Sequence, residues 1–186
     1  MSYSKDDLRD LFEGKLPWEK VKEIISKPKD DDRFDKYLEI LQERVPWEER
    51  ILLPLGEHLY VVQKGGERVV KCDCGHEFGD WRQNWKLSAL IFVRDDSTKL
   101  EEVYPGLHCP DPNLSELREY YCPSCGALLE VESTPLGYPA IFKALPDIDS
   151  LYRDWLGRPL PEEKEFKDMT YEVINEWKRG LQDGPG

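Results

Sequence analysis

The first residues of the chain place apolar side chains among charged ones at helical spacing. Ser4 is a suitable N-cap for a helix over residues 5–13, which Gly14 would end. Pro17 stands where the first turn of a helix tolerates proline, and it would open a second helix over residues 18–26. The pattern therefore predicts two short helices at the start of the chain.

A third helix is predicted up to about Arg44, where Pro46-Trp47 ends the pattern. Asp30-Asp31-Asp32 would cap its N-terminus and place favourable negative charge there. Its apolar positions recur at steps of three and four, as in a helix that covers a core. These positions are Phe34, Tyr37, Leu38, Leu41 and Val45. We therefore expect residues 1–50 to form an N-terminal helical arm.

From residue 51 the pattern changes to short apolar runs that are typical of strands. Residues 59–62 and 68–70 flank Gly65-Gly66, which is a two-residue hairpin signal. Further strands are predicted over 87–93, 120–121 and 127–131. A loop with some local structure is predicted over 95–112, and a short helical turn over 114–119. Residues 51–134 are therefore expected to form an antiparallel β domain.

The remaining residues, 135–186, are interrupted by prolines. A short helix is predicted over residues 149–155, ended by Gly157, and a charged helix over residues 162–181. The apolar side of the charged helix would consist of Tyr171, Ile174 and Trp177. The predicted fold class is α+β: an antiparallel β core with an N-terminal helical arm and a Pro-rich C-terminal extension that contains short helices.

Two cysteine pairs stand at the ends of predicted strands. Cys72-Asp-Cys74 and Cys122-Pro-Ser-Cys125 are each followed by glycine, which lets the backbone turn so that both sulfurs face one point. Four thiolates form a closed tetrahedral zinc site, in which no position is open for water or substrate. The β core is therefore expected to resemble a zinc ribbon, with a structural zinc held by Cys72, Cys74, Cys122 and Cys125.

The spacing of the pairs leaves other interpretations open. Forty-seven residues separate Cys74 from Cys122, whereas compact ribbons have about 15–20, so the ribbon must contain a large insertion. His76 is an alternative ligand in place of Cys74, or a hydrogen-bond donor behind the ligands. Iron–sulfur clusters use other spacings, and a redox dithiol at Cys72 and Cys74 is disfavoured by the paired turns. Cys109, in a Pro-rich loop, is interpreted as an ordinary thiol.

The charge of the chain argues against nucleic acid as a partner. The 186 residues carry a net charge of −12. Between Lys64 and Thr134 there are eight basic and thirteen acidic side chains, so the expected ribbon is itself negative and would repel phosphates. The six tryptophans are more than a small ribbon core can bury, so we expect several of them to dock on another chain.

The sequence also predicts the compartment. Residues 1–7 lack the apolar run of a secretion signal, and no apolar stretch approaches the about 20 residues that span a bilayer. We therefore expect a cytoplasmic protein with no membrane partner. In a reducing compartment, paired cysteines indicate metal ligands rather than disulfides.

The sequence contains few candidates for catalysis. The histidines are His58, His76 and His108, and none of them completes a Glu-x-x-His metal pair. Gly65-Gly66 lies between predicted strands and is interpreted as a turn rather than a phosphate-binding loop. No nucleophile elbow is present. We therefore assign no catalytic residue and expect a scaffold or accessory subunit.

Many segments, in order along residues 5–160, resemble the gamma subunits of acetone carboxylases. The two most specific are Cys72-Asp-Cys74-Gly-His76 and Arg118-Glu-Tyr-Tyr-Cys122-Pro-Ser-Cys125-Gly126. The others are Tyr-Leu-Glu-Ile-Leu-Gln-Glu-Arg at 37–44, Pro-Trp at 46–47, Ile-Leu-Leu-Pro-Leu-Gly at 51–56, Asp-Trp at 80–81, Asn-Trp-Lys-Leu-Ser-Ala at 84–89, Glu-Val-Tyr-Pro at 102–105, Pro-Asp-Ile at 146–148 and Trp-Leu-Gly at 155–157.

The resemblance implies a zinc-binding subunit in a complex with larger alpha- and beta-type carboxylase subunits, arranged as a dimer of heterotrimers. Such a complex carboxylates acetone with bicarbonate and ATP, giving acetoacetate, AMP and two phosphates. The resemblance implies that manganese and the sites for ATP with Mg lie in the larger subunits. A related acetophenone carboxylase has a similar small subunit, so that ketone is an alternative. A free-standing zinc-ribbon module for protein interaction or regulation is the alternative outside this family.

Overall fold

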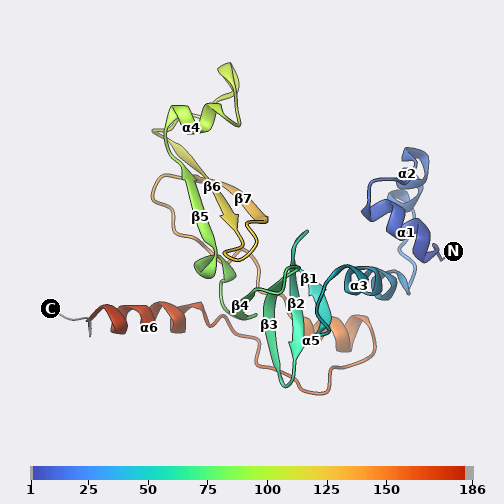
Figure 1. Cartoon of the computed structure of the whole chain (residues 1–186). Helices are drawn as coiled ribbons and strands as arrows, with labels where there is room; N and C mark the ends of the chain where they lie inside the picture. The colour runs from blue at the N-terminus through green and yellow to red at the C-terminus, as the bar shows by residue number, and fades with distance from the viewer. Residues whose placement is uncertain (1, 183–186) are drawn as a thin grey trace.

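Within the described part of the chain, residues 2–182 of the computed structural model, two antiparallel sheets follow three helices (Figure 1). Shorter helical segments and one longer helix come after the sheets. The α+β class predicted from the sequence is confirmed. None of the helices in residues 2–182 has the length and apolar character to cross a membrane.

Sheet A has the strand order β1-β2-β3-β4, with all neighbours antiparallel. Its strands are β1 (Arg50–Pro54), β2 (Leu59–Lys64), β3 (Glu67–Cys72) and β4 (Glu77–Asp80). The predicted hairpin is confirmed, because Lys64 lies opposite Glu67 across the Gly65-Gly66 turn. Gly65 has φ +57°, a conformation that glycine adopts without strain. The same hairpin carries Cys72 to the end of β3.

The N-terminal helices are α1 (Lys5–Phe12), α2 (Trp18–Ser26) and α3 (Arg33–Arg44), close to their predicted bounds. The Ser4 hydroxyl caps α1 by accepting a hydrogen bond from the backbone N–H of Asp7 at 3.0 Å. Asp32 precedes α3 but does not cap it with its side chain, because its carboxylate pairs with Lys36 at 2.8 Å.

The apolar stripe of α3 packs on sheet A, as its spacing predicts. Leu38 and Leu41 are buried in a cluster with Ile51, Tyr60 and Val62 of β1 and β2. The other stripe positions are partly buried against the same cluster: Phe34, Tyr37 and Val45. This contact places the end of α3 beside the end of β3.

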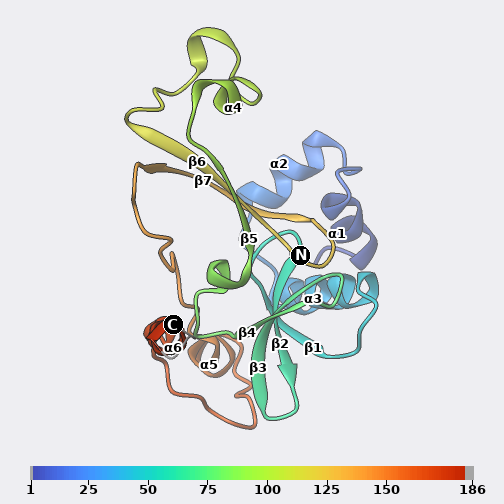
Figure 2. The ribbon, with the colours of Figure 1, turned by 60° about the vertical axis from the view of Figure 1, so that its left-hand side comes forward.

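Sheet B has the order β5-β6-β7 and is also antiparallel. Its strands are β5 (Leu90–Arg94), β6 (Ser115–Tyr121) and β7 (Leu128–Pro135), and the short helix η1 (Trp85–Ser88) precedes β5. The β5–β6 connection contains α4 (Ser97–Glu101) and η2 (Gly106–His108). In both views this connection extends from sheet B away from sheet A (Figures 1 and 2).

The helical turn predicted over residues 114–119 was wrong. Residues 115–121 form β6 instead, which pairs with β5 on one side and with β7 on the other. Hydrogen bonds to two neighbouring strands outweigh a weak local helix preference, because that preference amounts to only a fraction of a kcal/mol per residue.

The last segment contains α5 (Ile148–Ser150), the adjoining π-helical turn η3 (Leu151–Trp155) and α6 (Thr170–Gln182). The helix predicted over 162–181 begins only at residue 170. Before it, the backbone makes other hydrogen bonds: the Glu162 carbonyl accepts from Arg68, and the Met169 N–H donates to the Arg82 carbonyl. In Figure 1 α6 extends away from the sheets.

One core joins the two sheets and the segment after them. Ile148 and Tyr152 are fully buried in it, and the Tyr152 hydroxyl donates to the Leu52 carbonyl at 3.0 Å. Between the sheets, four aromatic rings meet edge to face in sequence, with centroids 4.9–6.0 Å apart. They are His76, Phe78, Trp85 and Tyr120. The four predicted ligands lie beside this row.

Candidate metal centre

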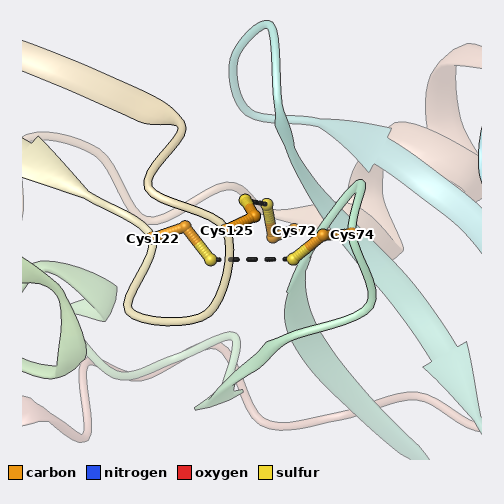
Figure 3. Close-up of side chains that lie close together, drawn as sticks. All are labelled: Cys72, Cys74, Cys122 and Cys125. Carbon is orange, nitrogen blue, oxygen red and sulfur yellow. Dashed lines mark hydrogen bonds between the residues drawn. The ribbon is translucent and has the colours of Figure 1, made fainter.

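Two turns, one from each sheet, bring four cysteines together (Figure 3). Cys72 ends β3 and Cys74 lies in the β3–β4 turn, whereas Cys122 follows β6 and Cys125 lies in the β6–β7 turn. All four Sγ atoms lie within 4.8 Å of one another. The cysteines that the sequence singled out therefore converge, and the point where they meet lies between sheet A and sheet B.

The sulfur positions fit a tetrahedral zinc ion. A Zn–S bond of about 2.3 Å requires sulfurs about 3.8 Å apart at the corners of a tetrahedron. The Sγ atoms of Cys72 and Cys125 are 3.8 Å apart, and those of Cys74 and Cys122 are 3.7 Å apart. A set of four sulfurs also selects a soft metal over calcium or magnesium. Both the donor type and the spacing are therefore compatible with zinc.

The two turns have the same backbone hydrogen bonds although they differ in length. In the first, the Cys72 carbonyl accepts from the Gly75 N–H at 2.9 Å; in the second, the Cys122 carbonyl accepts from the Gly126 N–H at 2.9 Å. Both glycines have positive φ, +99° for Gly75 and +73° for Gly126. Glycine is required there because other residues are strained in this conformation.

Burial and hydrogen bonding shift the pKa values of the clustered thiols in different directions. Cys72 and Cys122 are buried, whereas Cys74 and Cys125 are exposed. Burial raises the pKa of the Cys72 thiol. Burial would also raise the pKa of Cys74, but the His76 backbone N–H and the neighbouring thiols outweigh it, so that this pKa is lowered. A metal bound by thiolates must displace the remaining protons, so its affinity rises with pH.

Two other candidate residues lie outside the cluster. His76 is not one of the four converging side chains, and its ring packs edge to face against Phe78 at 4.9 Å. Its backbone N–H, rather than its imidazole, acts on Cys74. Cys109 lies in the β5–β6 connection, where its thiol donates to the Pro110 carbonyl at 3.5 Å. The structure therefore brings neither side chain to the candidate site.

Two residues that the sequence analysis did not assign to the site hold the first cysteine turn. The indole N–H of Trp47 donates to the carbonyls of Cys72 and Asp73 at 3.2 and 3.0 Å. Nδ1 of His58 lies 2.6 Å from the Asp73 carboxylate, and the Asp73 N–H donates to the His58 carbonyl at 3.1 Å. The sequence carried no signal for these contacts, since Pro46-Trp47 indicated only the end of a helix.

Comparison with known proteins identifies the family. The family model described as acetone carboxylase gamma subunit matches residues 45–156. This chain belongs to that family. The matched residues contain all four cysteines together with Trp47 and His58. The resemblance found in the sequence is therefore confirmed.

Two curated proteins are similar to this member of the acetone carboxylase gamma subunit family. The acetone carboxylase gamma subunit of Xanthobacter autotrophicus is 47% identical over 164 residues, which cover 87% of this chain and 98% of that subunit. The acetophenone carboxylase beta subunit of Aromatoleum aromaticum is 33% identical over 81 residues, covering 42% of this chain and 63% of that subunit. The similarity to the first protein thus extends over nearly its whole length.

Proposed function

We propose that this chain is a structural, zinc-binding accessory subunit of an ATP-dependent ketone carboxylase. Its complex would convert acetone, bicarbonate and ATP to acetoacetate, AMP and two phosphates. The observation that carries the proposal is membership of the acetone carboxylase gamma subunit family, supported by 47% identity to one such subunit. The weaker and shorter match to an acetophenone carboxylase subunit favours acetone as the ketone.

In this proposal Cys72, Cys74, Cys122 and Cys125 bind one zinc ion as thiolates. When bound, the zinc supplies a cross-link and no reactive position, because four sulfurs complete a tetrahedral shell. Two of the ligands come from a turn of sheet A and two from a turn of sheet B, so the ion would cross-link the two sheets. Within residues 2–182, no strand of sheet A pairs with a strand of sheet B. The strand β4 does contact η1, the short helix that precedes β5. This placement supports the proposal of a structural role for the zinc.

The proposed catalysis takes place in larger alpha- and beta-type subunits, which would hold the manganese, the magnesium and the ATP. The assembly proposed is a cytoplasmic dimer of heterotrimers. Within residues 2–182, His58 and Asp73 pair with each other beside the first cysteine turn. We therefore assign no catalytic residue to this chain.

Exposed aromatic residues support the proposal that the chain docks on larger subunits. Trp81 and Trp85 are buried in the core and Trp47 is half-buried. Three tryptophans on the helical segments are exposed: Trp18, Trp155 and Trp177. Trp155, with 84% of its surface exposed, lines an apolar groove of about 750 Å³ together with Leu8 and Phe34. Tryptophan is enriched at the energetic centres of protein interfaces.

An affinity purification of this chain from its native host tests the proposal. We expect larger subunits in equal number to this chain, with zinc and manganese in the intact assembly weighed by native mass spectrometry. The isolated chain should contain zinc and should show neither ATP hydrolysis nor carboxylation. A lone 21.8 kDa species, or turnover by the chain alone, would contradict the proposal.

A further inference from the structure

Trp47 connects the N-terminal helices to the candidate metal centre. It lies three positions after the end of α3 at Arg44 and three before β1 begins at Arg50. We propose that Trp47 is a positioning residue of this centre: its indole N–H fixes the backbone of the first cysteine turn and thereby the directions of Cys72 and Cys74. The inference rests on the proposed zinc site, and it adds a residue that no cysteine motif contains.

The geometry of the indole explains how one side chain can orient two sulfurs. Its N–H is shared between the carbonyls of Cys72 and Asp73, at 3.2 and 3.0 Å. These carbonyls belong to the two peptide groups on either side of Asp73. Because a peptide group is planar, holding both carbonyls limits the rotation of the backbone between Cys72 and Cys74. The directions of both Cα–Cβ bonds are limited with it.

The ring of Trp47 also limits the space around Gly75, the glycine that completes the turn. A methyl group at Gly75 would lie 3.5 Å from Cδ1 of Trp47, so the indole lies directly against this backbone. The carbonyls of the second turn, around Cys122, receive no comparable side-chain donor within the described residues. The first turn has one residue between its cysteines and the second has two. Of these two turns, the first is the one whose carbonyls accept hydrogen bonds from an indole N–H.

Trp47 is itself held in place by its surroundings. Its ring meets Tyr60 edge to face with centroids 6.1 Å apart, and the Lys71 ammonium lies 4.9 Å from the ring centroid. The side-chain amide of Gln42, on α3, donates to the Trp47 carbonyl at 3.3 Å and also accepts from the Ile51 N–H at 3.0 Å. A donor fixed in this way is already oriented before a metal binds, which strengthens its effect on the ligands.

The experiment compares Trp47→Phe with the wild type and with Trp81→Phe. Phenylalanine keeps an apolar ring at position 47 but removes the N–H. Trp81 is a matched control for lost packing, because it is 2% exposed and its indole nitrogen makes no hydrogen bond within residues 2–182. Each zinc-loaded chain is mixed with an excess of a chromogenic chelator, and zinc release is followed. Each chain is also loaded with Co²⁺, whose visible spectrum reports the arrangement of the four sulfurs.

We expect Trp47→Phe to release zinc about tenfold faster than the wild type, because loss of a group that orients metal ligands lowers metal affinity by about tenfold or more. Its cobalt bands should shift, whereas Trp81→Phe should match the wild type in both measurements. If Trp47→Phe does not fold, Gln42→Met provides the measurement, because it frees the Trp47 backbone and should also speed release. The inference would be overturned if folded Trp47→Phe showed the zinc-release rate and the cobalt spectrum of the wild type. If Gln42→Met is used in its place, the same result in that variant would overturn it. A wild-type chain that binds no zinc would instead refute the zinc site itself, and the inference with it.

Discussion

The guanidinium of Arg68 and the carboxylate of Asp149, which lie 81 positions apart in the sequence, form a bidentate ion pair. The two hydrogen bonds measure 2.7 and 2.6 Å, and only 1% of the Arg68 surface is exposed. The same groups bind the segment that follows η3: Arg68 donates to the Glu162 carbonyl, and Asp149 accepts from the Lys164 N–H. Burial would raise the pKa of Asp149, but Arg68 outweighs it, so the pKa is lowered. The pair thus joins β3 to α5 and to the C-terminal segment.

Replacing Asp149 should destabilise the fold strongly. In Asp149→Asn the Arg68 charge stays buried without its counter-ion, and breaking such a pair costs about 3–5 kcal/mol. Urea unfolding of the zinc-loaded chain measures the loss. The matched control is Asp154→Asn, which breaks the exposed pair with Arg153 and should cost less than about 1 kcal/mol. Equal stabilities of the two variants would contradict the structural role of the buried pair.

Replacing a clustered cysteine should remove the metal, whereas replacing the loop cysteine should not. In Cys122→Ser a buried sulfur of the cluster is lost, so we expect less than one zinc per chain and a lower melting temperature. Cys109→Ser, outside the cluster, should keep zinc and stability. Metal analysis of both purified variants and their melting curves test this prediction, and it is wrong if the two variants retain equal zinc.

Removal of the metal should destabilise the wild-type chain in a way that zinc reverses. A ligand that binds only the folded state stabilises it by about 4 kcal/mol when its free concentration is a thousand times its Kd. A chelator should therefore lower the melting temperature, and added zinc should restore it. The same titration on Cys122→Ser should change nothing, which distinguishes binding at the cysteines from binding elsewhere. A wild-type chain with the same melting temperature in chelator would refute the predicted cross-link.

A buried carboxylate on β7 should make stability depend on acid pH. The Glu132 carboxylate accepts hydrogen bonds from Lys86 and from the Tyr120 hydroxyl, both at 2.6 Å. Burial alone would raise its pKa, but these bonds and Lys143 outweigh it and lower the pKa to about 2. Because this lies below the unfolded value of 4.5, the stabilisation is complete above about pH 4.5 and is lost as the pH falls toward 2.

The variant Glu132→Gln isolates this contribution. At pH 7 it should be less stable than the wild type by about 3 kcal/mol, because the buried Lys86 loses its 2.6 Å carboxylate partner and keeps only the Glu130 carboxylate, 3.1 Å away. The difference between the two proteins should narrow as the pH is lowered from 5 to 3, and unfolding in urea at each pH measures it. Metal-free protein is used throughout, since acid also displaces zinc from thiolates. A difference that stays constant over this range would contradict the assignment.

An exposed tryptophan should matter for assembly and not for stability. Trp155→Ala removes a side chain that is 84% exposed, so the melting temperature of the isolated chain should change little. Loss of a central interface tryptophan weakens binding by at least about 2 kcal/mol, or about thirtyfold. Co-purification with the larger subunits should fall accordingly. Leu114→Ala, which alters a side chain that is 71% exposed, is the comparison; equal yields from wild type and both variants would contradict docking through Trp155.

Elements defined by neighbouring residues were predicted well. The Ser4 cap, the Pro17 start and the spacing of the α3 stripe act within a few positions, and they located the first three helices. The Gly65-Gly66 turn located the β2–β3 hairpin for the same reason. By contrast, β6 was assigned in part to a helical turn, because its pairing with β5 and β7 depends on residues far along the chain.

The sequence by itself determined the family, the α+β class and the two Cys-Gly turns, since these depend on residue types at short and regular spacing. Only the tertiary structure decided that four sulfurs lie within 4.8 Å, that Trp47 fastens one turn and that Arg68 pairs with Asp149. These contacts join residues 25 to 81 positions apart. Their free energy is gained only after the chain has closed the intervening loops. The cysteine pairs therefore indicated a shared site, but no local pattern encodes its geometry or the contacts of Trp47 and Arg68.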